Sequence, residues 1–155
     1  MRSSLVVAML GALTACAHSP ERSATPPPVA AAATTAAMWH SQHATLFERT
    51  WGVDVVGVRR ISSGQMLRFD YRILDPVKAT GMQDKTVKPY LTDDATGTRL
   101  AVPAMENVGE LRQTSTPVAG RTYFMIFGNP GGLVQSGARV SVVIGAFHAE
   151  GLIVE

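Results

Sequence analysis

The segment Gln65–Leu74 contains the clearest alternation of apolar and charged side chains in the chain. The apolar positions are Leu67, Phe69, Tyr71 and Ile73, and the charged positions between them are Arg68, Asp70 and Arg72. Because successive side chains of an extended chain point to opposite faces, this pattern predicts a strand with one buried face and one face in water. Such half-solvated strands are typical of antiparallel sheets.

The rest of the chain after Trp51 contains similar segments between turn-forming residues. Six more segments are rich in β-branched or aromatic residues, namely 51–60, 85–91, 98–102, 121–127, 138–144 and 147–154. About seven strands of this length predict an all-β fold, a small antiparallel β-sandwich. A partly open β-barrel is the alternative for the same strands.

Residues 38–50 have a different period, of about 3.6 residues. One side of a helix would carry Trp39, His43, Leu46, Phe47 and Thr50. We therefore expect a short amphipathic helix that lies on the sheet. The alanines of Ala30–Ala37 leave a second interpretation open, in which the helix begins earlier and continues into this segment.

The first sixteen residues have the pattern of a secretory leader. Arg2 precedes the nine-residue apolar stretch Leu5–Leu13. This stretch is shorter than the roughly 20 residues of a membrane-spanning helix, and it matches the apolar region of about 7–15 residues in a signal peptide. Small residues then precede Cys16, the only cysteine in the chain, and a single cysteine excludes a disulfide framework.

The segment Leu13-Thr14-Ala15-Cys16 resembles the lipobox of bacterial lipoproteins. The resemblance implies that residues 1–15 are a signal peptide that is removed, and that Cys16 becomes the first mature residue and carries acyl chains. Ala17 stands where that family typically has the aspartate that retains a protein at the inner membrane, which favours the outer membrane of a Gram-negative cell. Several acyl chains would give stable attachment. An ordinary signal peptide with an incidental cysteine is the alternative.

Residues 16–37 are predicted to connect the lipidated cysteine to the folded part of the chain. They consist mainly of Ala, Pro, Ser and Thr, with three consecutive prolines at positions 26–28. Consecutive prolines favour an extended conformation and block a helix through that point. The sequence thus predicts a signal peptide, this tether, a short helix over 38–50 and a β-sandwich over 51–155.

A glycine turn followed by a strand is formed by Leu133, Val134, Gly137, Val140 and Val142. The spacing of these residues resembles a segment of immunoglobulin-like and fibronectin type III-like domains. The resemblance covers about a third of the domain and implies an Ig-like sandwich. The Cys–Trp–Cys pattern of antibody domains is absent, so the resemblance concerns the architecture alone.

Residue types that can carry out catalysis are present, but they do not form a known catalytic motif. No nucleophile elbow, zinc-protease helix, dinucleotide fingerprint or phosphate-binding loop occurs in the sequence. His148, the only histidine after His43, lies inside a predicted strand. Asp93 and Asp94 fall in a tight turn that supplies too few oxygen ligands for calcium. We therefore expect a protein that is not an enzyme and needs no cofactor.

The segment Met38-x-His40-x-x-His43 brings possible metal ligands close together in the sequence. Thioether and imidazole groups together suit copper, and two histidines can begin a zinc site. Envelope copper or zinc binding through Met38, His40 and His43 is therefore the alternative function.

The charge balance bears on the partners of the chain. A formal net charge of +2 is too small for a strong nucleic-acid footprint. Together with the lipobox and the absence of catalytic motifs, the low net charge predicts a membrane-anchored lipoprotein of the cell envelope. We expect it to present a β-sandwich to an envelope protein partner.

Overall fold

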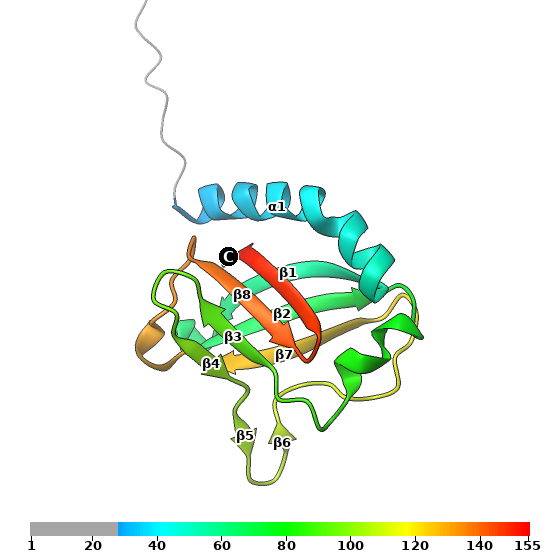
Figure 1. Cartoon of the computed structure of the whole chain (residues 1–155). Coiled ribbons are helices and arrows are strands. Elements are labelled where there is room, and N and C mark those ends of the chain that lie inside the picture. The colour runs from blue at the N-terminus through cyan, green and yellow to red at the C-terminus, as the bar shows by residue number, and fades with distance from the viewer. Residues whose placement is uncertain (1–27) are drawn as a thin grey trace, which may run out of the picture.

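The computed structural model describes residues 28–155, which form one long helix and three antiparallel sheets (Figure 1). The first sheet has the strand order β1-β2-β7 and consists of β1 (Val53–Ile61), β2 (Met66–Ile73) and β7 (Thr122–Gly128). The second sheet has the order β4-β3-β8-β9 and consists of β3 (Tyr90–Asp93), β4 (Arg99–Ala101), β8 (Arg139–Ile144) and β9 (Phe147–Ile153). The expectation of a mostly β, antiparallel fold is confirmed.

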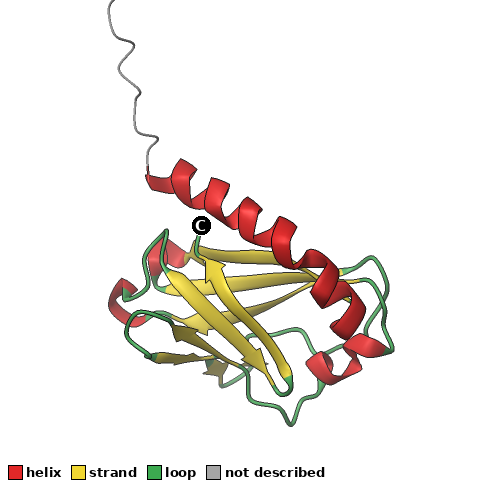
Figure 2. Ribbon diagram, turned by 45° about the horizontal axis from the view of Figure 1, so that its top comes forward, coloured by secondary structure: helices red, strands yellow, loops and turns green. Residues whose placement is uncertain are grey.

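The core lies between these two sheets (Figure 2). The apolar positions of β2, which are Leu67, Phe69, Tyr71 and Ile73, are completely buried. The second sheet contributes Leu91, Val140, Val142, Phe147 and Leu152 to the same cluster. The alternation in the sequence therefore predicted correctly which face of β2 is buried. Burial raises the pKa of the Tyr71 hydroxyl, which accepts a hydrogen bond of 2.8 Å from Gln83 Nε2.

Helix α1 (Pro28–Trp51) covers the place where β1 and β9 meet (Figure 1). It contacts both strands, and its Phe47 side chain is 3 % exposed and packs against Phe147 of β9, with ring centroids 5.5 Å apart. The helix therefore belongs to the folded domain and closes its core on one side.

A short parallel bridge joins the two main sheets below the helix. Val58 of β1 pairs with Val154, which follows β9 in the chain. The backbone N–H of Arg60 donates to the Glu155 carbonyl at 3.1 Å, and the N–H of Glu155 donates to the Val58 carbonyl at 2.9 Å. The chain after β9 thus fastens one sheet to the other.

The predicted helix boundary at residue 38 is wrong, because α1 begins at Pro28. Residues 28–37 are therefore part of the helix, and the tether predicted over 16–37 is too long by these residues. The alternative with a continuous helix through Ala30–Ala37 is the one in the structure. Alanine has the highest helix propensity, and proline is tolerated in the first helical turn, where its missing N–H has no helical partner. Ala32 is also buried, 4 % exposed.

The strand predicted over 85–91 is also only partly correct, since β3 begins at Tyr90. The carbonyl groups of Asp84, Lys85 and Val87 accept hydrogen bonds from the Arg112 guanidinium instead of from a neighbouring strand.

The connection after β4 contains a small hairpin that the sequence did not predict, formed by β5 (Ala104–Met105) and β6 (Gly109–Glu110). The described part of the chain also contains three short 3₁₀ segments, η1 (Ser62–Gly64), η2 (Lys78–Gln83) and η3 (Pro130–Gly132).

Candidate functional site

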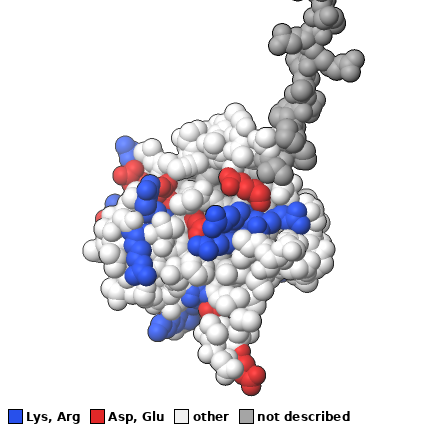
Figure 3. Space-filling model, turned by 180° about the vertical axis from the view of Figure 1, so that it is seen from behind, with Lys and Arg blue, Asp and Glu red and all other residues white. Residues whose placement is uncertain are grey.

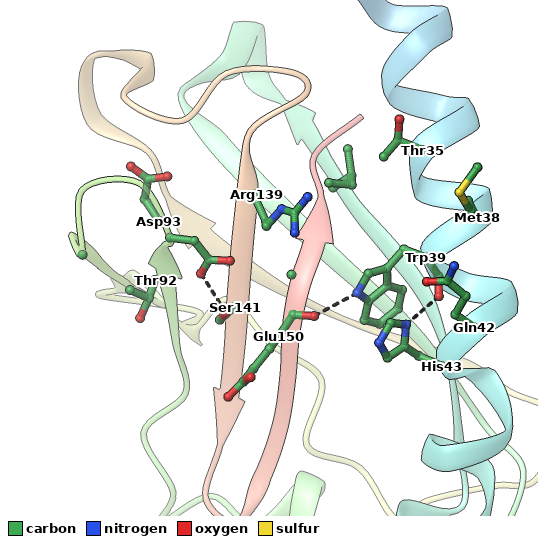
Figure 4. Close-up of a pocket in the computed structure, with 14 residues that line it drawn as sticks. Thr35, Met38, Trp39, Gln42, His43, Thr92, Asp93, Arg139, Ser141 and Glu150 are labelled. Atoms are coloured by element: carbon green, nitrogen blue, oxygen red, sulfur yellow. Dashed lines mark hydrogen bonds between the residues drawn. The ribbon is translucent and has the colours of Figure 1, made fainter.

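An open groove of about 770 Å³ lies between α1 and the outer face of β3, β8 and β9 (Figure 4). One wall is the helix, with Met38, Trp39 and His43. The floor is the outer face of β8 and β9, and the turn after β3 closes the far side. The groove is therefore built from three segments that are far apart in the sequence.

Aromatic side chains four residues apart stack on one another along the helix wall. Trp39 stacks on His43, with ring centroids 4.6 Å apart and 16° between the planes, and also on Phe47 at 5.7 Å. Residues four apart lie on one face of a helix, so the spacing seen in the sequence produces this stack directly. His43 Nδ1 hydrogen-bonds to the Trp39 carbonyl at 2.8 Å, which fixes the imidazole ring. The stack continues from the groove into the core through Phe47.

An irregularity in β9 brings the floor close to the helix wall. Val140 pairs with Leu152 and Val142 pairs with Ala149, which leaves Ser141 opposite two residues, Glu150 and Gly151. Such a bulge re-aims side chains and often lies beside functional sites. Gly151 has a φ of +70°, and a Cβ there would lie 3.6 Å from Trp39 Nε1. The indole Nε1 donates to the Glu150 carbonyl at 2.9 Å.

The groove carries side chains of both charges (Figure 4). Arg139 and Glu150 are exposed, and within residues 28–155 neither side chain forms an ion pair or a hydrogen bond. Asp94 Oδ1 accepts a hydrogen bond of 2.7 Å from Ser141 Oγ. Asp93, which is 6 % exposed, accepts one from Thr96. The described part of the groove thus has one cation, Arg139, and three carboxylates, Asp93, Asp94 and Glu150, none of which forms an ion pair, beside the edge of an aromatic stack.

A serine, a histidine and an aspartate line this groove, but they are not arranged as a catalytic relay. The Ser141 hydroxyl donates to Asp94 and makes no hydrogen bond with His43. A nucleophilic serine requires a base that can take its proton, and that base is normally oriented by a third group. The arrangement is suited to holding a ligand by hydrogen bonds and charge.

The structure separates the three residues predicted to bind metal. Met38 and His43 lie at the groove, whereas His40 points to β1 and its Nε2 lies 2.9 Å from Asp54 Oδ1. The other oxygen of Asp54 accepts a hydrogen bond of 2.7 Å from Arg72. In the part of the chain that the structure describes, no three His, Cys, Asp or Glu side chains are grouped as metal ligands.

The predicted lipidation site, Cys16, and the predicted signal peptide over residues 1–15 lie outside the described residues. Among the helices of residues 28–155, none has both the length and the apolar character needed to cross a bilayer.

The outer face of the first sheet carries a second group of charges (Figure 3). Asp70, only 7 % exposed, lies 2.8 Å from Arg68 Nε and 3.5 Å from Arg59. The Arg68 guanidinium also lies over the Phe124 ring, 4.3 Å from its centroid. Both arginines therefore have an acidic partner within the domain, and Arg68 has an aromatic partner as well.

No family model, curated protein or solved structure matches this chain. The groove residues Asp94, Arg139 and Glu150 were not identified from the sequence, because only the pairing of β3, β8 and β9 brings them together. The one local indication was Gly151, a glycine inside a predicted strand, which often marks a bulge.

Proposed function

We propose that the chain is a lipoprotein of the cell envelope, anchored through an acylated Cys16, whose domain binds a protein partner in the groove between α1 and β9. The observation that carries the proposal is the unpaired Arg139 and Glu150 beside Trp39. Protein interfaces are enriched in tryptophan and arginine, and complementary charges fix the orientation of a partner. A peptide segment with both charges and an apolar side chain would match the groove.

An Ig-like β-sandwich is the architecture that we propose for the domain. Apart from the β5–β6 hairpin, residues 28–155 contain seven strands, and the first, second and fifth of them share one sheet. The third, sixth and seventh share the other. Immunoglobulin-type sandwiches divide their strands in the same way, which supports the proposal. The fourth strand here pairs with the third instead of joining the first sheet.

The length of the connection to the proposed anchor also supports a function close to the membrane. Eleven residues, 17–27, separate Cys16 from the first residue of α1. Even fully extended, this segment would span at most roughly 40 Å. The first residue of α1 is therefore expected to stay within that distance of the lipid surface, and the groove residues of the helix lie roughly 10–22 Å farther along it. The proposed partner would therefore be a membrane protein or a protein held at the same membrane.

Site-specific crosslinking in cells tests the groove. We would place a photoreactive amino acid at Gln42, an exposed groove residue, and at Arg121, an exposed residue just before β7 and outside the groove, as a control position. The proposal predicts a discrete adduct from Gln42 that disappears when Arg139→Glu is added. Glu48→Lys, an exposed charge reversal outside the groove, should leave the adduct unchanged. An adduct that survives Arg139→Glu, or no adduct at Gln42, would contradict the proposal.

A further inference from the structure

Arg112 is a charged side chain held inside the domain, next to the β5–β6 hairpin. Its side chain is 1 % exposed. Nε donates to Glu110 Oε2 at 2.8 Å. Nη2 donates to three backbone carbonyl groups, at 3.2 Å to Asp84, 3.0 Å to Lys85 and 2.9 Å to Val87. One side of the guanidinium is thus fully engaged with the chain.

The other side of the same guanidinium has no partner. Arg112 Nη1 is buried and makes no hydrogen bond in the described part of the chain. Removing an N–H of a charged group from water without giving it an acceptor costs free energy, so buried donors of this kind are normally bound to water, an ion or a ligand. The unpaired Nη1 therefore indicates a place where an acceptor belongs.

Arg112 also lines a polar hollow of about 570 Å³ between residues 85–88 and the β5–β6 hairpin. Lys85, Lys88, Glu110 and Thr114 line the same hollow. Seen from behind, the molecule has Lys and Arg atoms gathered beside the base of the projecting hairpin (Figure 3). The unpaired donor and the surface cations thus occur at one location.

The hollow has an excess of positive charge. It contains three cations, Lys85, Lys88 and Arg112, and one carboxylate, Glu110, which gives a net charge of 3 − 1 = +2. Lys88 Nζ lies 2.5 Å from Glu110 Oε1, and the hydrogen bond from Lys88 is the main reason that the pKa of Glu110 lies below its usual range. Lys85 forms no ion pair within residues 28–155. The carboxylate that lines the hollow is therefore already paired, and the cations that line the hollow outnumber it.

The hairpin that covers Arg112 is small enough to move aside. Its strands, β5 and β6, have two residues each, and an isolated two-stranded hairpin is only marginally stable. Met105 and Val108 on it are exposed, 51 % and 72 %, so few apolar contacts hold its tip.

We propose that this hollow binds a phosphate group, with Lys85 and Arg112 Nη1 as the charged donors and Thr114 beside them. A phosphate group carries about 1.5 to 2 negative charges at neutral pH and has several acceptor oxygens, which matches a net charge of +2 and an unused guanidinium edge. A second carboxylate is a poorer match, because the position for a carboxylate is taken by Glu110. This site is separate from the groove at α1 and does not depend on a partner there.

Titration with inorganic phosphate tests the site. The full-length chain would carry Cys16→Ser, so that acylation cannot contribute to any binding, and chloride would keep the ionic strength constant. We expect a saturable heat of binding and a rise in the unfolding temperature with phosphate. Lys85→Gln should weaken phosphate binding about tenfold, the effect of one lost charged hydrogen bond. Lys78→Gln, a lysine outside the hollow, should leave the affinity unchanged.

The outcomes separate the sources of the phosphate. If the chain binds inorganic phosphate but no phosphatidic acid vesicles, the ligand of the hollow is a small phosphorylated molecule. Lys85-dependent cosedimentation with vesicles of phosphatidic acid, compared with phosphatidylcholine, assigns a lipid headgroup. The proposal is rejected if phosphate binding does not saturate, or if Lys85→Gln binds phosphate as tightly as the native sequence. In either case, water would be the acceptor for Arg112 Nη1. Because the Lys85 side chain is exposed, Lys85→Gln is expected to fold, so it tests phosphate binding without changing the buried Arg112.

Discussion

The indole Nε1 of Trp39 donates a hydrogen bond of 2.9 Å to the Glu150 carbonyl, across 111 positions of the sequence. The bond joins the middle of α1 to the bulge in β9. It makes the helix a wall of the groove and holds it against the domain, so the position of the helix and the shape of the groove depend on the same contact.

Trp39→Phe removes this bond but keeps an aromatic ring in the stack. We expect a loss of about 1 kcal/mol in the free energy of unfolding, the net contribution of a typical hydrogen bond. Urea unfolding followed by circular dichroism measures the loss. Leu46→Ala, at a helix position that is 59 % exposed, is the control and should change stability by less than about 0.5 kcal/mol. Equal stability of Trp39→Phe and the native chain would show that the bond contributes nothing.

Gly52 ends the helix in a conformation that other residues rarely adopt. Its φ is +63°, and a Cβ at this position would lie 2.6 Å from Asp75 Cβ and 2.7 Å from the Asp75 carbonyl oxygen. Gly52→Ala is therefore expected to cost at least about 2 kcal/mol of unfolding free energy, from backbone strain and the clash.

Gly81→Ala is the matched control for that variant, because φ at Gly81 is not in the positive range and a Cβ there meets no atom within 4 Å. It should be neutral or stabilise the protein by about 0.4–1 kcal/mol through the unfolded state. A similar loss in both variants, measured by thermal unfolding, would argue against a special role for Gly52.

Cys16→Ser tests the proposed anchor. Labelling with radioactive palmitate should be lost, and the protein should move from the membrane fraction to the soluble fraction, because Cys16 is the only cysteine. Ala17→Asp is the control, since it should keep the label and change only the membrane in which the protein is found. Labelling that persists in Cys16→Ser would exclude acylation at this residue.

Glu110 predicts a pH dependence of stability. The hydrogen bond from Lys88 and the charge of Arg112 lower the pKa of Glu110 in the folded protein below its ordinary value of 4.5. The stabilising contribution is therefore complete above pH 4.5 and is lost as the pH falls through the lower folded-state pKa. Glu110→Gln should be less stable than the native chain at neutral pH, and the difference should shrink in acid.

Urea midpoints measured from neutral pH into acid would follow this difference. Glu106→Gln, in the same connection, is the control, because the Glu106 carboxylate forms no ion pair among the described residues. A constant difference between Glu110→Gln and the native chain at all pH values would contradict the linkage.

The features predicted correctly from the sequence are those determined within a few neighbouring residues. The alternation in β2 placed Leu67 and Phe69 in the core, and the four-residue spacing of Trp39 and His43 placed both rings on one helix face. The start of α1 was wrong because the effect of three prolines was given more weight than the alanines that follow. Local patterns alone did not decide between these two preferences.

The candidate sites depend on contacts between distant residues, which local patterns do not contain. Arg112 draws the carbonyl groups of 84–87 away from a strand, and nothing near Lys85 in the sequence indicates this. The three suggested metal ligands show the opposite situation, in which residues close in the sequence are separated in the structure. His40 and His43 are close in sequence, yet Asp54 and the Trp39 carbonyl fix the two rings in different directions.

The bridge between Val58 and Val154 has a consequence for the order of folding. The segment that fastens the two sheets comes after all the other strands in the chain, and its partner β1 comes first. A chain that emerges from a ribosome or a translocation pore with its amino end first cannot close its core until β9 and Glu155 have appeared. In the export that we propose for this chain, the domain would therefore remain open during transport and reach its final stability only after transport is complete.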